Sequence, residues 1–165
     1  NAQSDFIYGI TNTFEYKGFD LNIFIQGSEG NDVLNAQRKN LDRFTAEGNS
    51  STLALDYWSP TNPKASQPSL NNPNIRYDSR YIEDGSYVRL KNLTVGYRFP
   101  GSLAEKVKFS GARLYFSAQN LITITNYTGY DPEVSRFRQS NTSPGVDAGS
   151  YPTSRAYTLG FNLTF

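Results

Sequence analysis

The stretch "RAYTLGFNLTF", from Arg155 to Phe165, decides the fold of this chain. Aromatic or aliphatic residues alternate in it with small or polar ones up to the last residue. Such period-two alternation is typical of a β-strand with one apolar and one polar face. The apolar positions are Tyr157, Leu159, Phe161, Leu163 and Phe165.

Four further segments alternate in the same way, so the sequence predicts five antiparallel strands near 6–16, 19–27, 86–99, 112–125 and 155–165. The first two are separated by Lys17-Gly18, a two-residue hairpin loop in which glycine accepts a positive φ. In the third, Val88 and Leu90 have the opposite parity to Leu93. Either a bulge near Lys91 reverses the faces of this strand, or its first part leaves the apolar layer.

The connections between these segments alternate in length. Lys17-Gly18 and 100–110 are short, whereas 28–85 and 126–154 are long and polar. Because antiparallel strands reverse direction, we expect the long connections at one end of the sheet and Phe165 at the other. The first long connection also predicts a short surface helix, since its apolar or long side chains recur at roughly helical spacing: Val33 or Leu34, Gln37, Leu41 and Phe44.

The composition excludes several functions. The chain has 165 residues with a net charge of +1, 12 Tyr and 11 Phe, but no Cys, Met or His. There is therefore no disulfide framework, no histidine base or metal ligand, and no basic footprint for nucleic acid. No serine lies in a "GxSxG" elbow. A carboxylate-pair glycosidase remains formally open, but the acids are scattered, so the sequence predicts neither an enzyme nor a cofactor.

Two environments explain the alternation. A soluble β-sandwich buries one face of its sheet against a second sheet, and an outer-membrane barrel turns that face to lipid. From Tyr157 to Phe165 is roughly 26 Å at about 3.3 Å per residue. A tilt of about 40° leaves roughly 20 Å of depth, against an apolar band of about 25 Å. Five strands are too few to close a barrel, so we expect an arc of a larger one whose other strands lie upstream of Asn1.

Four stretches together resemble a known family. They are "DYWSPTNP" (56–63), "YIEDGSYVRLKNLTVGYRFP" (81–100), "ARLYFSAQNLITITNYTGYDPEVS" (112–135) and "GSYPTSRAYTLGFNLTF" (149–165). They are similar to the C-terminal part of the SusC/RagA-like TonB-linked outer-membrane transporters of Bacteroidota. The resemblance implies an all-β, antiparallel up-and-down transmembrane β-barrel, of which this chain is about five C-terminal strands out of 22. The first 50 residues agree only in being two strands and a polar loop.

The resemblance also implies a function. Such proteins import oligosaccharides, peptides or other large nutrients through the outer membrane of a Gram-negative bacterium. Their partners are a SusD-like surface lipoprotein, the TonB complex, the barrel-assembly machinery and outer-membrane lipid. The plug and the TonB-contacting segment are absent from this chain, and its C-terminus is expected in the periplasm. The alternative is a soluble β-sandwich module that binds carbohydrate through exposed aromatic rings.

Three groups of residues are candidates for a role in this function. Phe165 resembles the C-terminal aromatic signal of barrel assembly. The acids Asp131, Glu133 and Asp147 are not a further group, because they match no calcium-loop spacing and the sequence predicts no metal site. Candidates for contact with a ligand or with the lid are Tyr57, Trp58, Tyr77, Tyr81, Tyr127, Tyr130, Arg136 and Arg138. Candidates for the lipid face are Leu93, Val95, Tyr97, Phe99, Leu114, Phe116, Tyr157, Leu159, Phe161 and Leu163.

Overall fold

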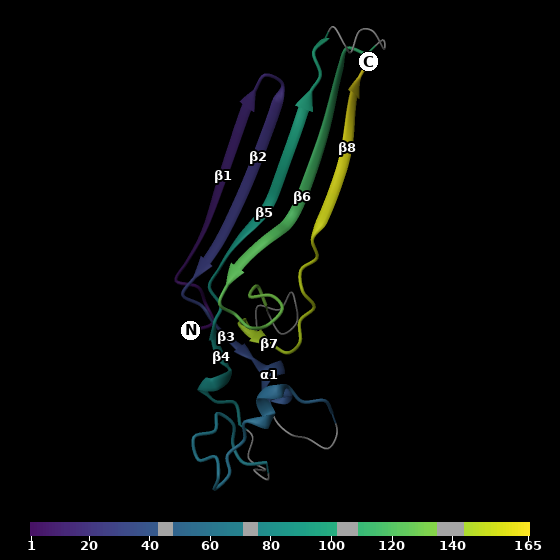
Figure 1. Ribbon diagram of the computed structural model, residues 1–165. Coiled ribbons are helices and arrows are strands. Elements are labelled where there is room, and N and C mark those ends of the chain that lie inside the picture. Colours follow the sequence, from purple (N-terminus) through teal and green to yellow (C-terminus); the bar gives the residue numbers. More distant parts are fainter. Residues whose placement is uncertain (43–47, 71–75, 102–108, 135–143) are drawn as a thin grey trace. The chain divides into compact units, whose positions relative to one another are not determined.

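The computed structural model describes residues 1–42, 48–70, 76–101, 109–134 and 144–165 (Figure 1). The chain divides into two compact units. The sheet unit comprises Ser4–Glu29, Ser86–Thr125 and Pro152–Phe165. The connection unit comprises Asn1–Gln3, Gly30–Gly85 and Asn126–Tyr151.

Five long strands form the sheet unit, and every neighbouring pair is antiparallel (Figure 1). The order is β1-β2-β5-β6-β8. Their observed ends lie within two residues of the ranges expected from the alternation. The strands are β1 (Phe6–Tyr16), β2 (Phe19–Glu29), β5 (Tyr87–Arg98), β6 (Gly111–Thr125) and β8 (Ala156–Thr164).

The β1–β2 hairpin turns at Lys17 and Gly18, whose φ angles are +46° and +88°. Two consecutive positive φ angles are characteristic of a type I′ turn, whose twist matches that of the flanking strands. A side chain at Gly18 is also blocked by the backbone, because its Cβ would lie 2.8 Å from the carbonyl oxygen of Arg98. The turn therefore sets the register in which Tyr16 faces Phe19.

A bulge at Lys91 resolves the change of parity within β5. The pairing with β2 passes from Ile25 opposite Leu90 to Phe24 opposite Asn92, so Lys91 is the extra residue. An extra residue in one strand reverses the alternation beyond it. Val88 and Leu90 therefore share the face of Leu93, as the bulge alternative predicted.

The sheet has two unlike faces. Apolar side chains cover one of them across all five strands, as in the row Phe14, Leu21, Val95, Phe116 and Leu159. This face is open: Phe14 is 56% exposed and Leu159 is 74% exposed. Polar, charged and small side chains dominate the other face. Among the described residues, β1 and β8 each pair on one side only.

The connection unit has a small core of its own. Its three-stranded sheet has the order β4-β3-β7, with β3 (Asp32–Asn35) antiparallel to β4 (Ile82–Asp84) and parallel to β7 (Val146–Asp147). The helix α1 (Ala36–Leu41) follows β3, and the 3₁₀ helices η1 (Thr52–Leu55) and η2 (Ser79–Tyr81) lie further along. Its buried apolar side chains are Val33, Ala36, Ala54, Tyr81 and Tyr127.

The expected short helix is present as α1, which contains Gln37 and Leu41 of the predicted spacing. Val33 and Leu34 precede it in β3, where Val33 is buried and pairs with Glu83 of β4, and the helix begins at Ala36. Asn35 caps it, accepting a hydrogen bond of 3.0 Å from the Arg38 backbone N–H, a role typical of Asn. Phe44, the last position of the expected pattern, lies outside the described residues. None of the helices described here is both long and apolar enough to cross a membrane.

Candidate functional site

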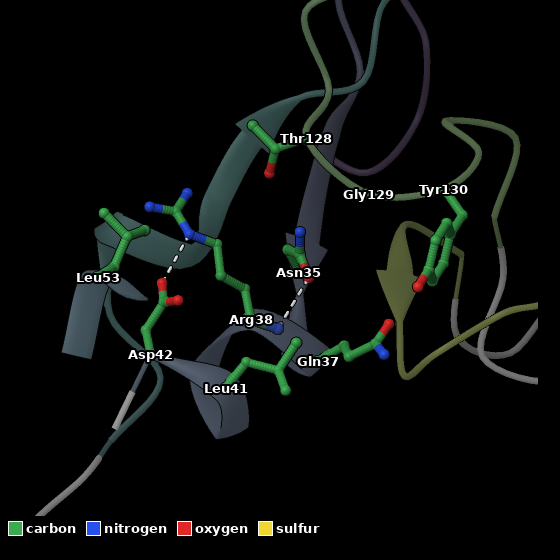
Figure 2. Close-up of a pocket in the computed structure, with 9 residues that line it drawn as sticks. All are labelled: Asn35, Gln37, Arg38, Leu41, Asp42, Leu53, Thr128, Gly129 and Tyr130. Carbon is green, nitrogen blue, oxygen red and sulfur yellow. Dashed lines mark hydrogen bonds and ion pairs between the residues drawn. The ribbon is translucent and has the colours of Figure 1, made fainter. Parts of the chain in front are cut away.

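A cavity of about 410 Å³ lies within the connection unit (Figure 2). Its volume falls within the range of small-molecule sites, about 300–1,000 Å³. Helix α1, η1 and the segment that follows β6 contribute the side chains around it. The lining residues are Asn35, Gln37, Arg38, Leu41, Asp42, Leu53, Thr128, Gly129 and Tyr130.

Arg38 joins the walls of this cavity. Its Nε donates a hydrogen bond of 2.8 Å to Asp42 at the end of α1, and its Nη1 donates one of 3.0 Å to Glu83 on β4. Ser51 donates to the other oxygen of Asp42 at 2.7 Å. Charge-assisted hydrogen bonds of this length are about twice as strong as neutral ones. The guanidinium therefore fixes α1 against β4, and Asp42 ties the end of the same helix to Ser51, just before η1.

Glu83 ties a third segment to the same network. Its carboxylate accepts hydrogen bonds from the Thr128 backbone N–H at 2.8 Å, from the Thr128 hydroxyl and from Asn35 Nδ2 at 3.2 Å. Burial acts to raise the pKa of Glu83, but the hydrogen bonds from Thr128 and Arg38 outweigh it and hold the pKa below its usual value. Glu83 is thus ionised in the folded unit at neutral pH.

A second carboxylate organises the segment around β7. Asp147 is 1% exposed and accepts hydrogen bonds from the Tyr127 hydroxyl at 2.6 Å and from the backbone N–H groups of Gly149 and Ser150 at 2.9 Å. Burial, and then the hydrogen bond to Asp147, raise the pKa of Tyr127 far above its usual value. Tyr127 is therefore a neutral donor that anchors Asp147.

The predicted contact residues do not gather at one place. Tyr130 lines the cavity and is 70% exposed. Trp58 and Tyr77 are exposed and do not line the cavity. The Tyr77 ring contacts Lys39, whose Nζ lies 3.8 Å from the ring centroid. Tyr57 is half-buried and forms an isolated β-bridge with Gln67. Tyr81 and Tyr127 are buried, a placement that favours packing over ligand contact. Arg136 and Arg138 lie outside the described residues.

The predicted lipid-facing residues share one face of the sheet. Their register aligns Leu93 with Ala118 and Tyr157, and Tyr97 with Leu114 and Phe161. Aromatic rings gather at the hairpin end of this face, where Phe19 and Tyr97 lie 4.6 Å apart and Tyr97 and Phe99 meet edge to face. Leu163 pairs with Ala112 on the same face, and Phe165 is 96% exposed beyond the last strand.

The opposite face carries charge near the hairpin end. Arg113 on β6 forms an ion pair with Asp20 on β2, across β5. Nearer the long connections, the Arg89 side chain is 2% exposed and donates to Thr123 Oγ1 at 2.9 Å. Its guanidinium lies 5.2 Å from the centroid of the Tyr87 ring.

Sequence reasoning missed the residues that build the cavity. Arg38 and Asp42 stand four apart in a helical segment, a spacing that brings opposite charges together, so this pair had a visible signal. Glu83 and Thr128 had none, because 45 positions separate them. No cluster of three metal-ligating side chains exists within the described part of the chain, Asp131, Glu133 and Asp147 included.

Comparisons with known proteins show which proteins the chain is similar to. No protein-family model matches it. It is 44% identical over 165 residues to TonB-dependent receptor P3 of Formosa agariphila, covering 98% of this chain and 16% of that protein. It is 30% identical to TonB-dependent receptor SusC of Bacteroides thetaiotaomicron, again over 98% of this chain and 15% of the relative. The chain thus spans about one sixth of the length of these relatives.

Solved structures agree with the sequence comparison. The RagAB peptide importer in its closed-closed state matches 99% of this chain and 18% of the importer chain, with a TM-score of 0.85 and 29% identity. The importer in its open-open state matches with a TM-score of 0.79 and 30% identity. These relatives are receptors and transporters and not enzymes, and TonB-dependent receptors are outer-membrane proteins. The chain is therefore a barrel segment of the SusC/RagA-like family of TonB-dependent outer-membrane receptors.

Proposed function

We propose that the protein to which this segment belongs imports a large nutrient, an oligosaccharide or a peptide, through the outer membrane by TonB-driven transport. The observation that carries the proposal is a sheet with an open apolar face, on which Leu159 is 74% exposed, backed by a polar face. A soluble β-sandwich would bury that apolar face against a second sheet. An outer-membrane barrel turns it to lipid and keeps the polar face for the lumen.

Orientation follows from the lengths of the connections. Outer-membrane barrels have short periplasmic turns and longer extracellular loops. We therefore assign the Lys17-Gly18 turn and Phe165 to the periplasmic side, and the connection unit to the extracellular side. On this assignment the chain supplies five C-terminal strands of the barrel, and Phe165 is the residue that the assembly machinery recognises.

Partners are assigned by the same reasoning. A SusD-like lipoprotein would close the extracellular side, where Trp58, Tyr77 and Tyr130 are exposed. TonB would act through parts of the protein outside this segment. The name of the RagAB peptide importer supports a peptide as one cargo class. The lipoprotein partner is proposed from the resemblance to SusC-like transporters.

The test uses two adjacent positions on opposite faces of β8. In a cysteine-free full-length protein, a spin label is attached at Leu159→Cys or at Thr158→Cys. Accessibility to oxygen, which concentrates in lipid, and to a water-soluble nickel chelate is then measured in the outer membrane. We expect oxygen to dominate at position 159 and the chelate at position 158.

Two results would contradict the proposal. Equal chelate accessibility at both positions would mean that the apolar face is not in lipid. A soluble, monomeric and cooperatively folded product from the isolated segment would instead favour the β-sandwich. Co-purification of a surface lipoprotein with the full-length protein, and loss of growth on a peptide or an oligosaccharide after deletion of its gene, test the partner and the cargo separately.

A further inference from the structure

The cavity of the connection unit presents two leucine side chains for which the described residues provide incomplete cover. Leu41, the last residue of α1, is 39% exposed and Leu53 of η1 is 44% exposed. Figure 2 shows both around the side chain of Arg38. Covering branched aliphatic carbon is favourable by about 25 cal/mol per Å². The walls of the cavity therefore suit an aliphatic group.

The polar groups of the cavity favour a ligand that offers an acceptor. Arg38 uses Nε and Nη1 on Asp42 and Glu83. Its Nη2 and the Gln37 side-chain amide donate to no other group within the described part of the chain. The carboxylates of Asp42 and Glu83 already accept from Ser51, Thr128 and Arg38. A ligand carbonyl oxygen would satisfy the remaining donors, and the Gln37 carbonyl would accept from a ligand N–H.

Charge excludes an anionic ligand. The single guanidinium of Arg38 faces two carboxylates, Asp42 and Glu83, so this group of residues has a net charge of −1. Like charges at short distance disfavour binding. The ligand that matches is neutral at this point.

The aromatic content of the cavity lining favours a peptide over a sugar as the ligand. Sugars bind on flat aromatic faces, to which their C–H groups stack. The lining has one aromatic ring, Tyr130, which Figure 2 draws beside Gln37 and apart from the two leucines. A peptide has an aliphatic side chain next to a carbonyl and an N–H, which is the combination that the leucines, Arg38 and Gln37 offer.

We propose that this cavity binds a neutral peptide through one aliphatic side chain, held between Leu41 and Leu53, and through the adjacent carbonyl group, held by Arg38. This inference rests on the import function proposed above and names a peptide as the cargo class that meets this site.

The test measures binding of acetyl-Gly-Leu-Gly-amide to the detergent-purified full-length protein by titration calorimetry. Leu53→Ala removes one wall without touching the Arg38 network. We expect it to weaken binding about fivefold or more. Leu55→Ala is the matched control, because Leu55 lies on the same 3₁₀ helix, is 65% exposed and does not line the cavity. It should leave affinity within twofold of the wild type.

Three further measurements make the test decisive. Leu41→Ala repeats the experiment with the other lining leucine, in case Leu53→Ala fails to fold. Acetyl-Gly-Asp-Gly-amide should bind at least tenfold more weakly than the leucine peptide, because of the excess negative charge. Maltotriose serves as the neutral sugar probe and should respond to neither leucine variant.

The outcomes separate this inference from the function on which it rests. Three results overturn the peptide site. They are an absence of peptide binding, equal peptide affinities of the Leu53→Ala and Leu55→Ala proteins, and leucine variants that weaken the binding of maltotriose but not of the peptide. A loss confined to binding of the lipoprotein partner also overturns it, since the cavity would then hold a partner loop. In each case the spin-label result on β8 still decides the transport proposal independently.

Discussion

The side chains of Asp20 and Arg113 meet across the strand that separates them. Arg113 Nε donates a hydrogen bond of 2.8 Å to Asp20 Oδ1, and Arg113 Nη2 donates to the other carboxylate oxygen. Asp20 lies on β2 and Arg113 on β6, on either side of β5. At the crossing point β5 carries Gly96, and a Cβ there would lie 2.5 Å from Arg113 Nη2. The ion pair therefore depends on a residue without a side chain.

This pair should couple β2 to β6 energetically. The two side chains are 18% and 23% exposed, and hydrogen bonds between charged groups contribute about 1.5–3 kcal/mol. In a double-mutant cycle of Asp20→Asn and Arg113→Met, we expect a coupling energy of about 1–3 kcal/mol. The readout is the temperature at which the full-length barrel loses its folded mobility on a gel.

The exposed Asn22–Thr13 hydrogen bond, on the same face, is the control for this cycle. Its coupling energy should be about 0.5 kcal/mol or less. A coupling energy for Asp20 and Arg113 no larger than that of the control would show that the ion pair does not contribute to stability.

Gly96→Ala should break the same ion pair by adding a methyl group that clashes with both of its side chains. The new Cβ would meet Arg113 Nη2 and, at 2.6 Å, Asp20 Oδ1, so one of the two side chains must move. Displacement of a packed group costs about 1–3 kcal/mol, and the folded gel mobility should be lost at a lower temperature. Gly101→Ala is the matched control, since its Cβ has no atom within 4 Å. An equal transition temperature for the two variants would refute the dependence on Gly96.

The sequence predicted the features that depend on neighbouring residues, but not the contacts between residues far apart in the chain. The five strands and their faces followed from period-two alternation, because each face needs only neighbouring residues to define it. The Asp20–Arg113 pair did not follow, because 93 positions separate its members and their meeting depends on the registers of two strand pairs. In the connection unit, Arg38 and Asp42 were within reach of helical spacing, whereas Glu83 joins them only through the pairing of β3 with β4.

Insertion of one alanine between Leu90 and Lys91 should prevent assembly of the barrel. Because the bulge accommodates one extra residue, a second one would enter the alternation and give the positions before it the opposite face, so Arg89 would leave the polar side of the sheet. A cation on the proposed lipid face costs roughly 2–4 kcal/mol at the membrane midplane, so we expect little or no insertion protein in the outer membrane fraction. Deletion of Lys91 is the control, because Leu90 then directly precedes Asn92 and regular alternation keeps Arg89 on the polar face. Equal amounts of the two proteins in the outer membrane would show that the faces of β5 do not depend on the residue count at the bulge.

Acid should loosen the connection unit through Glu83. Its pKa is lower in the folded unit than its ordinary 4.5, because hydrogen bonds from Thr128 and Arg38 outweigh the effect of burial. A lowered folded-state pKa means that its stabilisation is complete above about pH 4.5 and is lost as the pH falls through the folded-state value. Glu83→Gln should therefore increase hydrogen exchange of the α1 amides at pH 7, relative to the wild type, and the difference should shrink below pH 4.5. A difference that persists unchanged in acid would mean that the charge of Glu83 does not hold α1, and that the variant acts through packing alone.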